Sequence, residues 1–517
     1  MDLEFRLART HLPIAGLFRH AHEVPDALAL TDDRLTADGS PAPDAQRLTY
    51  GELLERVKAA AGRLAQAGVE RGDRVALVAG NCVEYPIITN AANYLGAIIV
   101  PVNFRLAAGE IAYILGHSDP KAVVVDEERE AVTRESTESL DVAVLGLAQT
   151  AAPAEDGAAF PDPVLCSLED DQAIMYTSGT TGRPKGAVLT YSNFLSTTMR
   201  SSASWAYHPE RDSVLVASPM FHIAAFNVMT TTLANACTCV IVPSTGFDAG
   251  HLLDVMAAHG VSRTFMVPAQ WQLMADEQRR SPRDVDLRFW SWGAAPATES
   301  LLTLLRETFP EAGSQAAFGQ TETTASGVSL GHEDSLRKLG SVGRPDRSYS
   351  IRVVDAKMND VAPGEVGEIV YRGPGVMDRF WNDEAATEEA FRGGWFHSGD
   401  LVRRDEEGFI YVVDRVKDMI ISGGENIYCA EVENVLAWHP QVAEVAVVGR
   451  KDPQWGEVPV AIVVPASDEE PPTLEDLRAF ADGKLARYKL PKAIRVVDAF
   501  PRSGTGKVQK TVLRETV

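Results

Sequence analysis

The sequence has few cysteines and no long apolar stretch, and each absence excludes a class of protein. Its five cysteines among 517 residues are scattered. Cys237 and Cys239 have no further Cys or His at ligand spacing, so we expect reduced thiols rather than disulfides or a zinc site. No run of about 18 apolar residues occurs, which argues against integral membrane contact. The first residues lack the basic-then-apolar pattern of a secretory signal, and we expect a cytoplasmic protein.

Basic residues are also in short supply. Lys and Arg number 49 against 72 Asp and Glu, for a net charge of −23, which argues against a nucleic-acid partner. Residues 484–514 are the exception, with nine Lys or Arg side chains and a single acid, Asp498. Such a segment is either a solvated basic face or a positive field that attracts phosphates or an acidic partner.

Length and hydrophobic patterning predict an α/β fold with more than one domain. The chain exceeds the limit of about 250–300 residues for one hydrophobic core. Short apolar strands alternate with helices, which is the pattern of parallel βαβ units. A capping box at Thr49 and Glu52 begins a helix that runs through Ala65. Further strands are expected at 74–78, 98–100, 122–126 and 261–267, and a further helix at 248–259.

The pattern changes towards the C-terminus. Short alternating strands with Gly-rich turns between Gly364 and Val413 predict a small β subdomain, at about 340–416 of an N-terminal domain 1–416. The remaining 417–517 predict a compact α+β domain. Its helices are expected at 430–438 and 473–485, and its strands at 442–449 and 458–464.

Residues 176–186 read Tyr-Thr-Ser-Gly-Thr-Thr-Gly-Arg-Pro-Lys-Gly and carry the strongest chemical signal in the chain. The glycines allow sharp turns and close approach of the backbone to a ligand. Exposed N–H groups, hydroxyls and the Lys185 ammonium form a donor-rich cradle for a polyphosphate. Apolar runs at 173–176 and 187–189 predict two strands that hold the loop. The common phosphate loop is a different pattern, because it places Ser or Thr after the Lys at a helix start.

This loop resembles the signature of the acyl-adenylate-forming superfamily, which includes acyl-CoA synthetases, adenylation domains and luciferases. Four more segments resemble other motifs of the superfamily in the right order, closest to its fatty acyl-CoA ligase branch. They are Phe-Gly-Gln-Thr-Glu at 318–322, Trp-Phe-His-Ser-Gly-Asp at 395–400, Asp-Arg-Val-Lys-Asp at 414–418 and Ser-Gly-Thr-Gly-Lys at 503–507. The resemblance covers essentially the whole chain. It implies a large N-terminal domain of mixed, mostly parallel sheets with helices, and a small mobile C-terminal domain.

The resemblance implies a binding site for ATP. The ring of Phe318 would stack on adenine and Thr321 would contact phosphate. Asp400 would accept hydrogen bonds from both ribose hydroxyls, which suits an ionised carboxylate, and Arg415 would also contact the ribose. The other ATP- or AMP-binding positions are Thr177, Ser178, Gly179, Thr180, Thr181, Gly182, Lys185, Ala294, Ala295, Gly319, Gln320 and Lys507.

The implied reaction needs positive charge at the site. A carboxylate that attacks the α-phosphorus of ATP brings two anions together, so positioning and charge neutralisation carry the catalysis. By the resemblance, Glu322 and Thr177 would hold Mg²⁺, and Lys185 would lie over the departing pyrophosphate. Lys507 would reach the α-phosphate and the carboxylate on a flexible stem. The expected catalytic residues are Lys507, Lys185, His222 and Thr321.

The acyl pocket is expected around His222, in a Pro-Met-Phe-His segment that resembles the block beside the acyl group. Relatives that activate α-amino acids carry Asp in this block, so an acid without an α-ammonium group is expected. Trp292 and Ala294 stand where the superfamily has smaller residues, which favours a short or medium acyl chain unless Trp292 points into the core. The expected pocket residues are His222, Phe226, Trp292, Gly293 and Ala294.

The second half-reaction requires a thiol to reach the acyl adenylate, and in the superfamily the C-terminal domain rotates between the two steps. Lys417 matches the hinge position, and Gly423 and Gly424 match a loop along the thiol tunnel. The acceptor is CoA or, alternatively, the phosphopantetheine of a carrier protein loaded with an acyl or β-amino acyl group. A non-catalytic nucleotide-binding relative is disfavoured, because it would have lost Lys507, Glu322 or Asp400. A homodimer is also considered.

Overall fold

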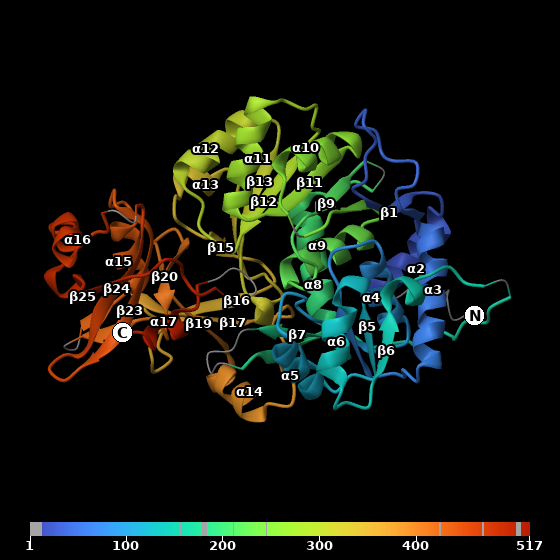
Figure 1. Ribbon diagram of the computed structural model, residues 1–517, viewed down its shortest axis with the longest axis horizontal. Helices are drawn as coiled ribbons and strands as arrows, with labels where there is room; N and C mark the ends of the chain where they lie inside the picture. Colours follow the sequence, from blue (N-terminus) through green and yellow to red (C-terminus); the bar gives the residue numbers. More distant parts are fainter. Residues whose placement is uncertain are drawn as a thin grey trace. The chain divides into compact units, whose positions relative to one another are not determined.

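The computed structural model describes residues 13–155, 157–177, 183–209, 211–244, 246–422, 425–467, 470–502 and 508–517. The chain divides into two compact units (Figure 1). The first unit extends to Ile351 and includes Tyr371–Phe396, and the second comprises Arg352–Val370 and His397–Val517. Two large sheets belong to the first unit, and most of two smaller sheets belongs to the second.

The first unit contains a seven-stranded sheet that includes the two strands on either side of the loop predicted to bind phosphate. Its strands β4, β3, β5 and β6 are parallel, β7 runs parallel to β4, and β8 runs antiparallel to β7. The predicted strands at 74–78, 98–100 and 122–126 are confirmed, because each is an apolar run buried on both faces. In spatial order the strands are β18 (Arg379–Phe380), β8 (Lys185–Thr190), β7 (Asp171–Thr177), β4 (Ile98–Pro101), β3 (Arg74–Val78), β5 (Ala122–Val125) and β6 (Ala143–Gly146).

A nine-stranded sheet forms the other half of the first unit. Its central strands are parallel, whereas β2 and β14 run antiparallel to their neighbours β1 and β13. In spatial order the strands are β15 (Arg344–Pro345), β14 (Val328–Gly331), β13 (Gly313–Phe318), β12 (Phe289–Gly293), β11 (Val261–Met266), β9 (Ser213–Val216), β10 (Thr238–Ile241), β1 (Leu28–Asp32) and β2 (Arg47–Thr49).

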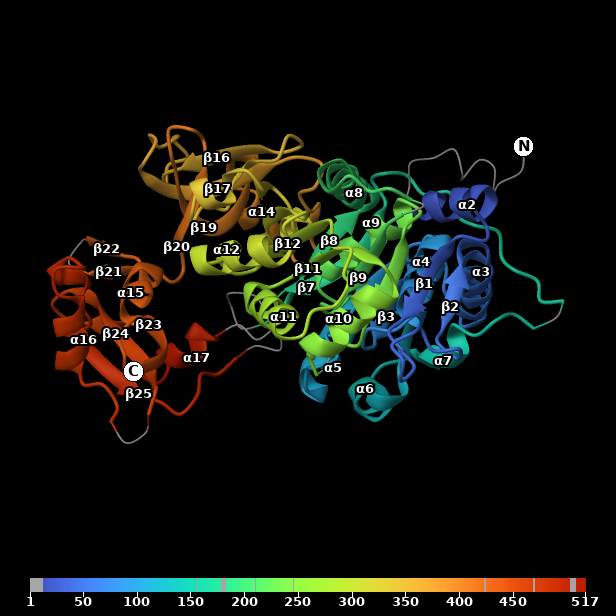
Figure 2. The same ribbon diagram turned by 90° about the horizontal axis from the view of Figure 1, so that it is seen from above.

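Helices separate and cover the two large sheets. Helix α8 (Tyr191–Trp205) packs on β8, and its neighbour α9 (Ile223–Ala234) packs on β9 and β10, so this pair lies between the sheets. Helices α10 (Ala249–Ala258), α11 (Pro268–Arg280) and α12 (Glu299–Thr308) lie side by side in Figures 1 and 2. The other helices of this unit are α2 (Pro13–Glu23), α3 (Tyr50–Gln66), α4 (Glu84–Tyr94), α5 (Ala108–Ser118), α6 (Glu130–Thr137), α7 (Leu147–Thr150), α13 (Asp334–Arg337) and α14 (Glu384–Ala390).

The start of α3 shows how a local sequence signal becomes structure. The hydroxyl of Thr49 accepts a hydrogen bond from the Glu52 N–H at 3.2 Å, and the Glu52 carboxylate accepts one from the Thr49 N–H at 2.8 Å. Two N–H groups that the helix itself cannot pair are thereby satisfied. The predicted capping box is confirmed.

A buried ion pair joins neighbouring strands of the nine-stranded sheet. Asp212 precedes β9, and its carboxylate lies 2.9 Å from the guanidinium of Arg263 on β11 and 3.2 Å from that of Arg288. The side chain of Asp212 is 0% exposed and that of Arg263 only 5%. Breaking such a pair leaves a buried charge poorly compensated, even if the intact pair adds little net stability.

We therefore expect Arg263→Met to lower the free energy of unfolding by about 3 kcal/mol. The matched control is Arg279→Met, since Arg279 and Glu307 are 3.9 Å apart and 59% and 63% exposed. A pair of that kind contributes at most about 1 kcal/mol. Urea unfolding monitored by tryptophan fluorescence compares the two variants. Equal shifts of the midpoint would contradict the assignment of Asp212 as a charge that depends on Arg263.

The second unit contains a four-stranded and a five-stranded sheet. The first has the order β16 (Ser350–Val354), β17 (Val366–Arg372), β19 (Phe396–Arg404) and β20 (Ile410–Arg415). The second has the order β22 (Glu425–Ile427), β21 (Ile420–Ser422), β24 (Gly456–Pro465) and β23 (Val442–Asp452), and β25 (Ala493–Val496) pairs with β24. Its helices are α15 (Cys429–Leu436), α16 (Leu474–Ala481) and α17 (Lys510–Arg514).

The end of one helix and the grouping of one sheet in this unit differ from the prediction. The helix expected at 473–485 ends at Ala481, because Gly483 adopts a left-handed backbone with φ +72°. Most of the small β sheet, which we assigned to the N-terminal domain, groups with the C-terminal residues in the second unit. The domain boundary at 416/417 stays a prediction, and Lys417 lies within the second unit.

All five cysteines are free thiols. Cys237, Cys239 and Cys429 are buried, and Cys82 and Cys166 are half-buried. Burial raises the pKa of every one of these thiols, that of Cys237 to about 12. Each therefore stays protonated at neutral pH, and none has the lowered pKa of a reactive cysteine.

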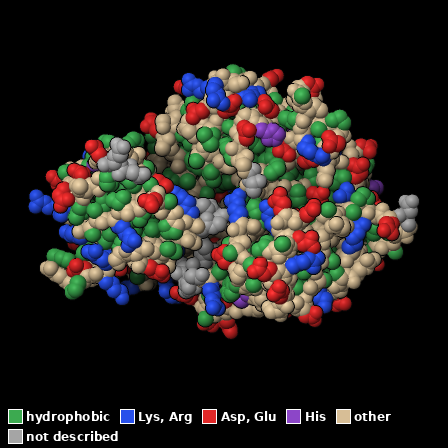
Figure 3. Space-filling model, in the orientation of Figure 1, with side chains coloured by type: hydrophobic (Ala, Val, Ile, Leu, Met, Phe, Trp, Pro, Cys, Tyr) green, Lys and Arg blue, Asp and Glu red, His purple; other side chains and the backbone are tan. Residues whose placement is uncertain are grey.

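The surface agrees with the charge pattern of the sequence. On the face of the first unit drawn in Figure 3, acidic and basic side chains are interspersed and form no basic stripe. None of the described helices combines the length and the apolar character that crossing a bilayer requires.

Candidate active site

The predicted phosphate loop joins two paired strands. Strand β7 ends at Thr177, β8 begins at Lys185, and these two residues face each other in the antiparallel pair. The predicted strands on both sides of the loop are confirmed. Five predicted binding residues lie outside the described residues, namely Ser178, Gly179, Thr180, Thr181 and Gly182.

Lys185 and Gly186 are held by close packing at the start of β8. The Lys185 ammonium lies 5.2 Å from the centre of the Phe380 ring. A Cβ on Gly186 would come within 2.7 Å of the Ile174 side chain, so a larger residue would push the strands apart. This packing fixes the position of the backbone from which the Lys185 side chain extends.

The two predicted metal ligands come together although they belong to different sheets. The Thr177 hydroxyl at the end of β7 donates to the Glu322 carboxylate at 3.2 Å, in the turn that follows β13. Among the described residues no cluster of three or more His, Cys, Asp or Glu side chains could hold a metal. Mg²⁺ commonly uses one or two protein oxygens and completes its shell with water and substrate phosphates, so the residues present fit this ion.

The turn that carries Glu322 is rigidly built. A Cβ on Gly319 would lie 2.4 Å from the Ser326 nitrogen, so the backbone packs against itself here. Thr324 and Ala325 both adopt left-handed conformations, with φ of +51° and +52°. Such strain persists only where the surrounding structure enforces it and is frequent at functional sites. Thr321 and Glu322 remain half-buried and accessible.

The ends of β12 and β13 bring further predicted residues together. Gly293 faces Ala317 in the parallel register and β13 ends at Phe318, so the segments beginning at Ala294 and Gly319 leave the sheet at the same edge. Ala294 has φ +64°, a conformation that favours glycine. This carboxyl edge of parallel strands is where open α/β sheets bind ligands. Five predicted ATP-binding residues therefore lie where they could contact a ligand. Ala294, Ala295 and Gly319 are exposed, and Phe318 and Gln320 are half-buried.

In the second unit the two predicted ribose residues form an ion pair. Asp400 of β19 faces Arg415 of β20, and the Arg415 Nε donates to the Asp400 carboxylate at 2.9 Å. Glu368 holds the preceding turn, because its carboxylate bonds to the His397 ring at 2.7 Å and accepts from the Gly399 N–H at 2.9 Å. No sequence motif indicated Glu368, since it lies 31 residues before Gly399.

The residue expected to act as hinge is held by the end of the chain. Arg514 of α17 donates to the Lys417 carbonyl at 3.0 Å and to the Asp418 carboxylate at 2.7 Å. The Cys429 thiol donates to the Asp418 carbonyl at 2.9 Å. Burial, with the neighbouring Arg415, lowers the pKa of Lys417. Gly423, Gly424 and Lys507, predicted for the thiol tunnel and catalysis, lie outside the described residues.

The cavity beside the predicted acyl site lies between α8, α9 and strands β11 to β13, and its volume is about 50 Å³. Ala224, two residues after His222, and Ser291, two residues before Gly293, contribute to its wall. His222 precedes the first turn of α9, next to Phe221. The cavity therefore adjoins the expected position of the carboxylate.

None of the five residues predicted for the acyl pocket is among those that line this cavity. Phe226 is fully buried and packs against Phe194 of α8. Trp292 points to the opposite face of β12 from Ser291, where its ring lies 5.1 Å from that of Trp290. Trp292 therefore does not narrow this cavity, because successive strand residues face opposite sides of a sheet.

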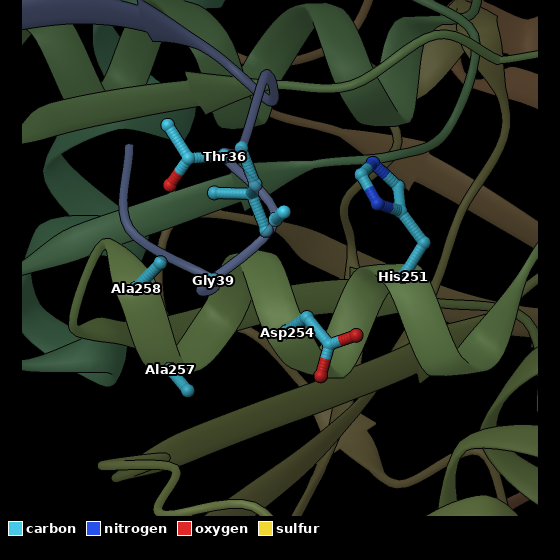
Figure 4. Close-up of a pocket in the computed structure, with 8 residues that line it drawn as sticks. Thr36, Gly39, His251, Asp254, Ala257 and Ala258 are labelled. Atoms are coloured by element: carbon cyan, nitrogen blue, oxygen red, sulfur yellow. The ribbon is translucent and has the colours of Figure 1, made fainter. Parts of the chain in front are cut away.

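A larger surface hollow of about 450 Å³ lies elsewhere on the first unit (Figure 4). It is lined by the loop around Thr36 and by His251 and Asp254 of α10. The His251 ring bonds to Asp33 at 2.8 Å, and Asp254 accepts from Arg283 at 2.9 Å. No residue of the predicted motifs lines this hollow.

Comparison with known proteins decides the family. The AMP-binding enzyme family model matches residues 17–381, and the model of the AMP-binding enzyme C-terminal domain matches residues 431–507. The chain belongs to the AMP-binding enzyme family. The resemblance drawn from the five motifs is thus confirmed.

Relatives in this family are CoA ligases. The chain is 37% identical over 501 residues to the long-chain-fatty-acid–CoA ligase FadD13 of Mycobacterium tuberculosis (strain ATCC 25618 / H37Rv), covering 94% of this chain and 96% of the relative. It is 38% identical over 474 residues to a feruloyl-CoA synthase of Amycolatopsis sp, covering 90% and 93%.

A solved structure of the family confirms the fold. The o-succinylbenzoate CoA synthetase MenE of Bacillus subtilis, in complex with its acyl-adenylate intermediate, matches with a TM-score of 0.85 and 32% identity over 96% of this chain and 97% of that one. The same enzyme with ATP and a magnesium ion matches with a TM-score of 0.84. The α/β fold expected from the sequence is confirmed.

Proposed function

We propose that this chain, an AMP-forming acid–thiol ligase, joins a carboxylic acid to CoA in two steps. ATP first converts the acid to an acyl adenylate with release of pyrophosphate, and the thiol then displaces AMP. The hydrogen bond between Thr177 and Glu322 carries the proposal best, because it gathers oxygen ligands at the mouth of the polyphosphate loop. CoA is the expected acceptor, since the relatives reported above are named CoA ligases or synthetases.

Residues of the first unit bind the triphosphate and the acid in this proposal. The loop 177–185 surrounds the phosphates, and Lys185 neutralises charge on the departing pyrophosphate. Phe318 stacks on adenine, and Thr321 positions a phosphate. Magnesium held by Glu322 and Thr177 would supply further positive charge at the phosphates. His222 borders the carboxylate.

Residues of the second unit bind the ribose and supply the mobile lysine. Asp400 accepts from the two ribose hydroxyls, and Arg415, already paired with it, adds a donor. Lys507 delivers a charge to the α-phosphate during adenylation, and Gly423 and Gly424 line the path of the thiol. Lys417 is the pivot between the two steps. These assignments rest on the motif matches. We also propose that the enzyme is cytoplasmic.

A carrier protein is the alternative acceptor, and the basic segment 484–514 supports it, because carrier proteins that are acidic would be attracted to it. Incubation with ATP, Mg²⁺, a panel of carboxylic acids and either free CoA or a holo carrier protein separates the two acceptors. Mass spectrometry of the thioester identifies the product. Thioester on CoA alone supports the proposal, and thioester only on carrier protein favours the alternative. If no acid in the panel leads to pyrophosphate release, both are overturned. Size-exclusion chromatography of the same preparation tests for a homodimer.

Glu322→Gln is expected to raise the Mg²⁺ concentration for half-maximal adenylation by roughly 10–100-fold, because a neutral amide replaces a charged oxygen ligand. Pyrophosphate release measured over a range of Mg²⁺ at fixed ATP checks this. Glu311→Gln is the control, since Glu311 is exposed and lies outside the motifs. An unchanged Mg²⁺ dependence in Glu322→Gln would contradict the metal assignment.

A further inference from the structure

The cavity between α8, α9 and strands β11 to β13 carries more hydrogen-bonding groups than an alkyl tail could use. Ala224, Val228 and Phe265 form apolar parts of its wall. Asn227 and Thr231 of α9 and Ser291 of β12 also line it. With a volume of about 50 Å³, the cavity accepts a group of a few heavy atoms rather than a long chain.

Five polar side-chain atoms of this wall have no hydrogen-bond partner. They are the hydroxyls of Ser291, Thr231 and Thr197, the side-chain carbonyl oxygen of Asn227 and the Nε of Arg200. Ser291 and Thr231 are 1% exposed, and Asn227 is 8% exposed. The Asn227 amide nitrogen donates to the Thr324 carbonyl at 2.8 Å, which fixes the orientation of the amide. Buried polar atoms without partners are rare and costly in folded proteins, so five around one cavity indicate a missing hydrogen-bonding guest.

The wall also contains a charge, but that charge is balanced. Arg200 of α8 lines the cavity, and its Nε lies 3.7 Å from the carboxylate of Asp346, close enough to balance the charge but without a hydrogen bond. Both side chains are largely buried, at 15% and 8% exposed. Asp346 in turn accepts from the Gly327 N–H at 3.3 Å and from the Ser329 hydroxyl. A guest that adds a second negative charge would face a compensated arginine, whereas an uncharged oxygen needs no such partner.

We infer that the acid activated by this protein has a short acyl group with an uncharged oxygen, as a hydroxyl, oxo or ether group, at its far end. The inference rests on the proposed function, because it places the acyl group in this cavity. Asn227 and Thr231, one helical turn apart on α9, would contact that oxygen from one side, and Ser291 from the sheet. These three residues then determine specificity.

The test compares acids in matched sets of three. The sets are butanoate, 4-hydroxybutanoate and succinate; hexanoate, 6-hydroxyhexanoate and adipate; and benzoate, 4-hydroxybenzoate and terephthalate. Pyrophosphate release with ATP and Mg²⁺ gives kcat/KM for each acid. We expect the hydroxylated acid to exceed both others at least about 10-fold in the set that reacts best, since unpaired buried groups penalise the analogue that lacks the oxygen. Preference for the unsubstituted acid or for the dicarboxylate in that set would overturn the inference.

Two variants link the preference to the cavity. Thr231→Val and Ser291→Ala preserve the apolar shape closely, and each is expected to reduce the hydroxyl preference at least about 3-fold. Thr230→Val is the matched control, because the neighbouring Thr230 hydroxyl already donates to the Phe226 carbonyl at 3.0 Å. An unchanged preference in both cavity variants would refute the assignment of these residues.

Thermal unfolding supplies a readout that needs no substrate. Thr231→Val should raise the Tm, because it removes a buried hydroxyl that has no partner, whereas Thr230→Val should not. A lower Tm for Thr231→Val would show that the hydroxyl is already satisfied and would refute the inference. If none of the nine acids led to pyrophosphate release from ATP, the result would instead count against the proposed function. The Tm comparison would still test the cavity.

Discussion

Lys507→Ala should abolish adenylate formation and leave thioester formation from supplied acyl-AMP nearly intact. In the first step the lysine would offset the charge of the α-phosphate and the approaching carboxylate, and losing one such preorganised group costs roughly 10²–10³-fold in rate. In the second step the anhydride is already formed and the thiol attacks without that charge. Single-turnover assays with radiolabelled ATP, and separately with synthetic acyl-AMP and CoA, measure the two rates.

A neighbouring lysine provides the control for Lys507→Ala. Lys492 is exposed and belongs to the same basic segment, so Lys492→Ala removes equal charge without touching the motif. If Lys507 acted only through the positive field of the whole basic segment, both variants would slow adenylation to the same extent. Equal loss of both half-reactions in Lys507→Ala, with unfolding unchanged, would refute a role confined to the first step.

Lys417→Pro should separate the half-reactions in a different way. Rotation about Lys417 requires its backbone dihedrals to change, and proline fixes φ near −65°. We expect adenylation to stay close to the wild-type rate and thioester formation to fall by about 10²-fold, the cost of misplacing reacting groups. Lys417→Ala keeps the backbone free and should affect both steps far less.

The contacts of Arg514 make the Lys417 prediction more specific. Arg514 donates hydrogen bonds to the Lys417 carbonyl and to the Asp418 side chain. Rotation of the backbone at Lys417 must therefore either break these hydrogen bonds or move α17 as well. Helix α17 begins three residues after Lys507. The same two single-turnover assays apply, and an equal fall in both rates with unchanged unfolding would refute the pivot.

Strands of strong apolar character were predictable from the sequence because burial on both faces leaves a continuous apolar run. The strand at 74–78 was found with its observed bounds, as was the capping box of α3. The same property made the lining of the small cavity unpredictable. In β12 every residue from Trp290 to Gly293 is buried, so no alternation revealed that Ser291 rather than Trp292 faces the cavity.

Contacts between distant residues could not be predicted from local sequence patterns. The motif matches placed Thr177 and Glu322 in one site only through the resemblance, since 145 residues separate them. Arg514 and Lys417 are 97 residues apart, and no motif joins them. Local patterns report burial and turns, whereas such pairings depend on the complete packing of strands and helices.

The burial of the cysteines bears on how such an enzyme coexists with its own acceptor. A ligase that uses a free thiol meets the disulfides that this thiol forms in air, and exchange with them requires a protein thiolate. Burial raises the pKa of all five thiols and restricts access to them. All five thiols are therefore poor attacking groups toward such disulfides, which disfavours mixed disulfides between the enzyme and its oxidised acceptor.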